Sequence, residues 1–86
     1  MRDQRIIKKY PNRRLYDSAQ SRYVTLADIR KLVMQRVRFD VIDQSNRADI
    51  TRTVLLQAIL DQQQAGKLIL TRAFLERVIR SGRRKR

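Results

Sequence analysis

The densest cluster of chemically useful side chains in this 86-residue sequence lies near its beginning, in the run KKYPNRRLYD. Lysine and arginine neutralise phosphates and release counterions, and an arginine fork can also grip the edge of guanine. Asparagine can pair with adenine by the same two-point geometry, and tyrosine hydroxyls can reach phosphate oxygens. The candidate nucleic-acid contacts are therefore Lys8, Lys9, Tyr10, Asn12, Arg13, Arg14, Tyr16 and Arg22.

The same residues also have an ordinary structural interpretation. A basic stretch in a strand and turn can be a solvated face with no ligand. Tyr10, Tyr16 and Tyr23 are expected to be packing residues first, with any phosphate contact by their hydroxyls as a second role. Both interpretations stay open on the residues alone.

The charge of the chain favours a polyanionic partner. The formal net charge is +13 and the isoelectric point is about 11.6. Residues 1–38 carry a net +8, residues 39–69 a net −1 and residues 70–86 a net +6. This segregation is typical of an electrostatic footprint, with a near-neutral middle that supplies the scaffold.

Several classes of function are disfavoured by what the sequence lacks. It contains no cysteine and no histidine, so disulfides, thiolate metal sites and imidazole catalysis are excluded, and we expect neither an enzyme nor a cofactor. The pair Asp40 and Asp43 has too few oxygen neighbours to predict a cation site. The absence of a long apolar run predicts a soluble cytosolic protein rather than a membrane protein. We expect one small domain over residues 1–82 and a basic tail over residues 83–86.

The first half of the chain alternates between strand and helix patterns. A strand is predicted over Arg5–Tyr10, a turn at Pro11–Asn12, and a β-hairpin whose arms, 14–16 and 22–24, flank a five-residue loop. Thr25 and Asp28 fit a capping box, which predicts a helix with Leu26, Ile29, Leu32 and Val33 on its buried face. The alternation in 37–43 predicts a further strand, a turn follows at 44–47, and 48–50 returns as a short second strand.

The second half predicts two helices. Thr51 is the expected N-cap of a helix that ends near Gly66, and its wide apolar arc, residues 54–60, predicts burial on two sides. Residues 68–70 are expected to dock as an extended piece. Thr71 is expected to cap a last helix, closed by residues 81–82, whose apolar stripe is formed by Phe74, Leu75, Val78 and Ile79. The stripe can fill the core or form a subunit interface. The mixed order of elements predicts a small α+β domain.

Two motifs resemble a known bacterial family. Residues 8–17 and the following SRYVTLADI, residues 21–29, resemble the motifs of the N-terminal DNA-binding domain of the polyhydroxyalkanoate (polyhydroxybutyrate) accumulation regulator family. The resemblance continues through FDVID, DITR and LIL, so that it covers about residues 5–80. Three departures stand out. Ser18 replaces a usual threonine, Asn46–Arg47 stands where the family often has Thr-Gly, and the chain ends where family members usually continue.

The resemblance implies a cytoplasmic transcriptional repressor that binds promoters of granule genes, chiefly those of phasins, and leaves DNA when polymer granules accumulate. It places Lys8, Lys9, Asn12, Arg13 and Arg14 on double-stranded DNA. The early end of the chain implies either a DNA-binding fragment or a short member in which granule sensing is missing or rerouted. A homodimer or higher homo-oligomer is expected, since pairing doubles the phosphate contacts of so small a domain.

Two other functions remain open. In one, the protein is an adaptor whose apolar helices adsorb on polyester granules or a partner protein while its basic regions hold DNA without sequence preference. In the other it binds RNA, although the aromatic-rich sheet motifs of common RNA modules are absent from the sequence. The tail from Arg83 to Arg86 is either solvated or a non-specific DNA arm.

Overall fold

A computed structural model of the chain describes residues 5–64, 66 and 70–82. These residues form a four-stranded sheet and three helices, which confirms the α+β class. In chain order the elements are β1 (Ile6–Lys9), β2 (Leu15–Asp17), β3 (Arg22–Val24), α1 (Leu26–Met34), β4 (Asp40–Asp43), α2 (Thr51–Gln64) and α3 (Arg72–Gly82).

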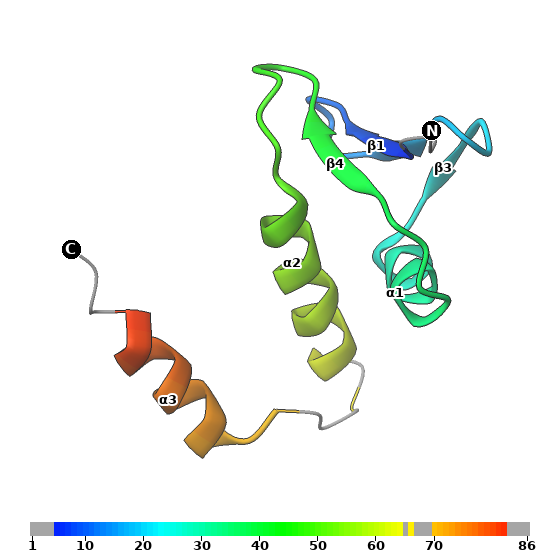
Figure 1. The fold of residues 1–86 in the computed structure, drawn as a ribbon. Helices are drawn as coiled ribbons and strands as arrows, with labels where there is room; N and C mark the ends of the chain where they lie inside the picture. Colours follow the sequence, from blue (N-terminus) through cyan, green and yellow to red (C-terminus); the bar gives the residue numbers. More distant parts are fainter. Residues whose placement is uncertain (1–4, 65, 67–69, 83–86) are drawn as a thin grey trace.

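The strand order in the sheet is β3-β2-β1-β4. β2 lies antiparallel to both β1 and β3, whereas β4 runs parallel to β1, with Ile7 opposite Val41 and Lys9 opposite Asp43. Neighbouring parallel strands end at the same edge of a sheet. The loops that follow β1 and β4 therefore leave the sheet at one end (Figure 1).

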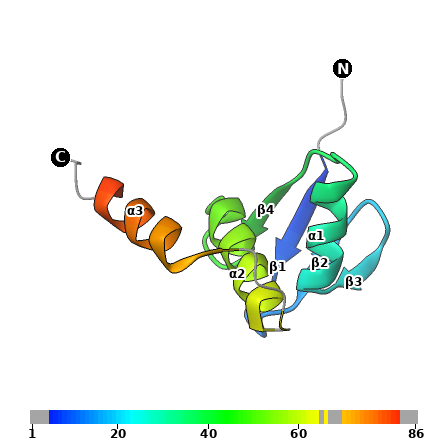
Figure 2. The same ribbon diagram turned by 90° about the horizontal axis from the view of Figure 1, so that it is seen from below.

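Helices α1 and α2 cover one face of the sheet, as Figure 2 shows, and the small core lies between the two layers. Ile7 and Val41 from adjacent strands and Ile29 from α1 are completely buried. The remaining members of the core are Leu15, Val24, Leu32, Val54 and Ala58. Because side chains alternate along a strand, the residues between these positions lie on the other face of the sheet.

The capping box that opens α1 is confirmed. The Thr25 hydroxyl accepts from the Asp28 backbone N–H, and the Asp28 carboxylate accepts from the Thr25 N–H at 2.8 Å. Ile29 and Leu32 lie in the core as predicted, but the prediction for Val33 is wrong, since it is 48% exposed. The helix packs on the sheet along a narrower stripe than the pattern indicated.

The strand predicted over residues 37–43 is shorter than expected, because β4 begins only at Asp40. Asp40 stands opposite Ile6, the first residue of the neighbouring strand β1, and donates its N–H to the Arg5 carbonyl. The hairpin loop is also shorter, because Asp17 belongs to β2. The predicted return strand at 48–50 forms a single bridge, between Ile42 and Asp49.

Helix α2 begins differently from the prediction. Thr51 lies inside the helix rather than at its cap, and its hydroxyl accepts from the Val41 N–H at 2.8 Å, which ties α2 to β4. The Asp49 carboxylate accepts from the Thr51 backbone N–H and hydroxyl. These two hydrogen bonds lower the pKa of Asp49, the hydroxyl bond more than the backbone bond.

The far end of α2 agrees with the sequence. Gly66 has a φ of 96° and donates its N–H to the Gln63 carbonyl, as a left-handed cap requires. Burial on two sides is not found. Val54 and Ala58 face the core, but Leu56 and Leu60 on the opposite side are more than half exposed. This side of α2 has no covering element among the residues that the structure describes.

Helix α3 stands apart from the rest of the described chain (Figures 1 and 2). Thr71 caps it as predicted, with its hydroxyl accepting from the Phe74 N–H at 3.1 Å. The apolar stripe does not enter the core, because its four side chains are 45% to 73% exposed: Phe74, Leu75, Val78 and Ile79. Residues 68–69 of the predicted extended piece 68–70, and the tail 83–86, lie outside the described residues.

Candidate nucleic-acid interface

The turn between β1 and β2, residues 10–14, is a preorganised cationic tip. The Arg13 N–H donates to the Tyr10 carbonyl at 2.8 Å, and the Tyr10 N–H donates to the Arg14 carbonyl at 3.0 Å. The Asn12 side-chain oxygen accepts from the Arg14 N–H at 3.0 Å, and Arg13 has a φ of 69°. Asparagine readily forms such Asx turns. Two exposed arginines are thus carried on a turn closed by three hydrogen bonds.

The three tyrosines form one cluster on the face of the sheet that the helices leave open. Tyr16 stands opposite Tyr23 on β3 and opposite Lys8 on β1. The Tyr16 ring meets the Tyr23 ring edge to face, with centroids 5.2 Å apart, and meets the Tyr10 ring in the same way at 6.5 Å. This agrees with the interpretation of the tyrosines as packing residues. Aromatic pairs of this geometry hold neighbouring strands together.

The side chain of Arg14 packs on one ring of this cluster, that of Tyr23. Its guanidinium carbon lies 3.9 Å from the centroid of the Tyr23 ring, within the range of a cation–π contact. Tyr23 was not among the predicted site residues, and its 45% exposure leaves part of the ring accessible to a ligand. The sequence held one signal for it: Val24 is an apolar core residue, so the neighbouring Tyr23 must lie on the opposite, open face of the sheet.

Beside the turn lies an open hollow of about 840 Å³. Its lining includes Lys9, Arg13 and Arg14, and contains no carboxylate among the described residues. A hollow lined by cations and by no carboxylate favours the binding of anions, although Asp43 stands opposite Lys9 on β4. Seven of the predicted residues therefore belong to β1, β2 and the turn between them, although Lys8 and Lys9 lie on opposite faces of the sheet: Lys8, Lys9, Tyr10, Asn12, Arg13, Arg14 and Tyr16.

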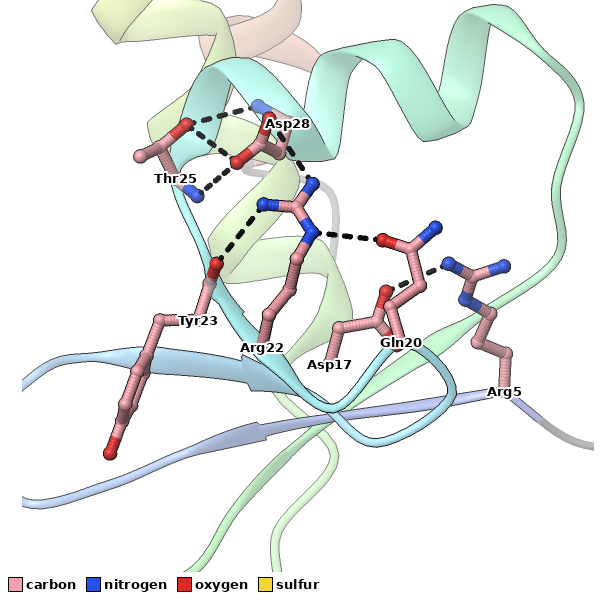
Figure 3. Close-up of polar contacts among 7 residues, drawn as sticks. All are labelled: Arg5, Asp17, Gln20, Arg22, Tyr23, Thr25 and Asp28. Carbon is pink, nitrogen blue, oxygen red and sulfur yellow. Dashed lines mark hydrogen bonds and ion pairs between the residues drawn. The ribbon is translucent and has the colours of Figure 1, made fainter.

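Arg22 is not part of this group. It stands opposite Asp17, at the other end of the β2–β3 pair from the turn. Figure 3 shows its guanidinium directed towards the chain's own acceptors, the Gln20 side-chain oxygen at 3.1 Å and the Asp28 carboxylate at 3.9 Å. The hydrogen bond from the Thr25 backbone N–H is the main cause that lowers the pKa of Asp28, and the charge of Arg22 lowers this pKa further. The geometry favours a structural role for Arg22.

Asp17 also differs from its prediction as a loop residue. Its side chain is 1% exposed, and its carboxylate accepts from the Arg5 guanidinium at 2.7 Å and from the Ala19 N–H at 3.0 Å (Figure 3). The bond from Ala19 folds the side chain back on its own backbone, whereas the ion pair reaches a residue beside β1 that the hairpin pattern did not indicate. It clamps β1 to β2 at the end of the sheet opposite the turn.

Among the residues that the structure describes, no group of three or more acidic side chains is placed to hold a metal ion. Within the same ranges, no helix has the length and apolar character needed to cross a membrane.

The features described so far define the class of protein: a small α+β domain whose exposed, hydrogen-bonded turn carries a cluster of cations. The sequence model of the PHB/PHA accumulation regulator DNA-binding domain matches residues 6–66, and the chain belongs to this family. The match confirms the resemblance seen in the motifs. It includes the turn, the tyrosine cluster and the helices α1 and α2, whereas α3 lies beyond it.

Two curated relatives are 51% identical to the chain over 80 residues, which is 93% of the chain. One is named "Uncharacterized protein in phbA 5'region" and comes from Thiocystis violacea; the other is an uncharacterized protein of Allochromatium vinosum. The chain spans 58% and 52% of their respective lengths. No solved structure is significantly similar to the chain.

Proposed function

We propose that the chain is a sequence-specific transcriptional repressor that binds promoters of polyhydroxyalkanoate granule genes, phasin genes among them. Membership in a family of DNA-binding regulators of PHB and PHA accumulation supports this. The name of one relative, which refers to the region 5' of phbA, also supports a link to polymer metabolism. A protein with promoter DNA as its partner acts in the cytoplasm, at the nucleoid or at the granule.

The observation that carries the proposal is the preorganised turn with Arg13 and Arg14 at its tip. Because the turn is closed before DNA arrives, little conformational entropy is lost on binding. Lys8, Lys9 and Arg13 neutralise phosphates, and Arg14, held on the Tyr23 ring, extends its remaining N–H groups to a base edge or phosphate.

The main role of Asn12 is to shape the turn rather than to pair with adenine. Its side-chain oxygen already accepts from the Arg14 N–H, so the turn sets the orientation of the amide and leaves only the second lone pair of this oxygen for adenine. Its amide N–H₂ group remains for a phosphate or a base acceptor. We infer that Asn12 mainly keeps the turn in shape, and that Tyr10 and Tyr16 support it from the open face of the sheet.

Equilibrium binding to the DNA upstream of the chain's own gene tests the proposal. If about six phosphates are engaged, a plot of the logarithm of affinity against the logarithm of salt concentration has a slope of about −5. Arg14→Ala should weaken binding and change the order of preference among promoter variants if its fork reads a base. Arg38→Ala, which removes an exposed cation ahead of β4, is the matched control and should leave that order unchanged. A salt-insensitive binding curve would contradict the proposal.

We further propose that the protein binds DNA as a homodimer or higher homo-oligomer through α3. An isolated helix of 11 residues is marginal in water, and the apolar stripe of α3 has no partner among the described residues. Burying this stripe against a second copy would stabilise it. Sedimentation analysis with Leu75→Glu should give a lower mass than wild type with an unchanged melting temperature of the sheet domain.

The exposed stripe also gives a route for release from DNA when polymer accumulates. A hydrophobic polyester surface would compete for the same side chains and separate the copies, which halves the number of phosphates held by one complex. Added polymer granules should therefore displace the wild-type protein from promoter DNA. The Leu75→Glu variant, already weakened on DNA, should respond much less.

The same exposed face favours a second candidate function, the adaptor that attaches granules to DNA without sequence preference. In that case random-sequence competitor DNA would displace the protein from its promoter as well as cognate DNA does. A clear preference for cognate competitor would exclude the adaptor.

A further inference from the structure

A second turn with the same construction as residues 10–14 lies at the same end of the sheet. It follows β4 and comprises residues 44–48. The Asn46 side-chain oxygen accepts from the Ala48 N–H at 3.0 Å, as the Asn12 oxygen accepts from the Arg14 N–H. Arg47, directly after this asparagine, has a φ of 63°, close to the 69° of Arg13. In each turn an exposed arginine with a left-handed backbone conformation directly follows the asparagine that forms the Asx turn.

The sheet topology brings the two turns together. β1 and β4 are parallel neighbours, and the pairing continues into the second turn, where the Gln44 N–H donates to the Lys9 carbonyl at 2.9 Å. Adjacent strands lie about 4.8 Å apart. Charges on one DNA strand succeed each other at about 3.4 Å along the helix axis. Arginines on neighbouring strand ends can therefore reach the same stretch of one DNA backbone.

Arg47 is available for such a contact. It is exposed, and it forms no ion pair with any residue in the described ranges. The nearby carboxylates serve the chain's own backbone, Asp43 accepting from the Ser45 N–H and Asp49 from the Thr51 N–H. A left-handed conformation disfavours arginine relative to glycine, so the turn itself gains nothing from a long cationic side chain.

We propose that Arg47 is a second DNA-contacting residue, which acts beside Arg13 on one phosphate backbone. The inference rests on the proposed DNA-binding function and deepens it: the DNA contact extends from the β1–β2 turn to the turn after β4. Sequence spacing did not reveal it, because residues 13 and 47 become neighbours only through the parallel pairing of β1 with β4.

Glycine substitutions at three left-handed arginines give a matched test, with the full chain and a DNA fragment from upstream of its own gene as the probe. Arg47→Gly and Arg13→Gly each remove a guanidinium from this end of the sheet. Arg36→Gly, with a φ of 61°, removes the same charge from the loop that leads into β4 at the opposite end. Because glycine accepts this conformation, all three variants should keep a near wild-type melting temperature.

We expect Arg47→Gly and Arg13→Gly each to weaken binding about three- to tenfold at 0.1 M salt and to reduce the salt slope by about 0.9, the value of one phosphate contact. Arg36→Gly should change affinity less than about twofold. If Arg47→Gly behaves like Arg36→Gly while Arg13→Gly weakens binding, the inference about Arg47 is wrong and the proposed function stands. If the wild-type chain shows no salt-dependent binding to the fragment, both are wrong.

Discussion

Removing the Arg5 side chain from its buried ion pair with Asp17 should strongly destabilise the domain that carries the cationic turn. The Asp17 carboxylate is almost fully buried and has two partners, the Arg5 guanidinium and the Ala19 N–H. Arg5→Ala leaves it charged in the protein interior with only one hydrogen bond. Breaking a buried pair from one side costs about 3–5 kcal/mol.

The cost is reduced here because the Arg5 side chain is 21% exposed, so that water reaches part of the site. We expect a loss of about 2–4 kcal/mol. For a domain of this size each kcal/mol corresponds to about 4–8 °C in melting temperature, which gives a decrease of about 10–25 °C. Thermal unfolding followed by circular dichroism measures it directly.

The double variant Arg5→Ala with Asp17→Asn distinguishes two effects: the cost of leaving a charge buried without its partner, and the loss of the Arg5–Asp17 contact itself. An asparagine at position 17 keeps an acceptor for the Ala19 N–H and carries no charge. The double variant should therefore be more stable than Arg5→Ala alone. The reasoning is refuted if the double variant is no more stable than the single one, or if Arg5→Ala melts within about 3 °C of wild type, a change under 1 kcal/mol.

Further predictions concern the helix cap, the tyrosine cluster and the last helix. Asp28→Ala should cost about 1 kcal/mol at neutral pH. Since the cap lowers the pKa of Asp28 from its ordinary 3.8, the stabilisation is present above about pH 4 and is lost as the pH falls through the lowered value; a difference in melting temperature that persists at strongly acid pH would contradict this. Tyr23→Leu should weaken DNA binding several-fold by releasing Arg14, whereas Tyr23→Phe should bind as wild type does, and equal binding by both would show that the ring contact is irrelevant. Val78→Glu should lower the oligomeric mass in sedimentation without changing the melting temperature of the sheet domain, and a large thermal destabilisation would mean that α3 packs in the core after all.

Local signals in the sequence predicted the local structure well. The capping box of Thr25 and Asp28 and the left-handed Gly66 depend on hydrogen bonds within a few residues, so they could be found from spacing alone. The same holds for the β1–β2 turn, where Asn12 bonds to a residue two positions away.

Features that depend on distant residues were missed or misplaced. Asp17 reads as a loop residue until Arg5, twelve positions earlier, is brought against it. Threonine is a common N-cap residue, but the Thr51 hydroxyl accepts a hydrogen bond from the Val41 N–H on β4 instead of capping α2. A helical stripe such as that of α3 indicates an apolar face, and spacing alone does not tell whether the chain's own core covers it. Arg22 was grouped with the turn because of its charge, although the hairpin register carries it to the other end.

The central claim, that the chain reads specific DNA, is tested most directly by one specificity ratio. Affinity is measured at 0.1 M salt for the fragment upstream of its own gene and for random-sequence DNA of equal length. A specific regulator should prefer its promoter by about 10³-fold or more. Equal affinity for the two DNAs would contradict the claim and favour the adaptor instead.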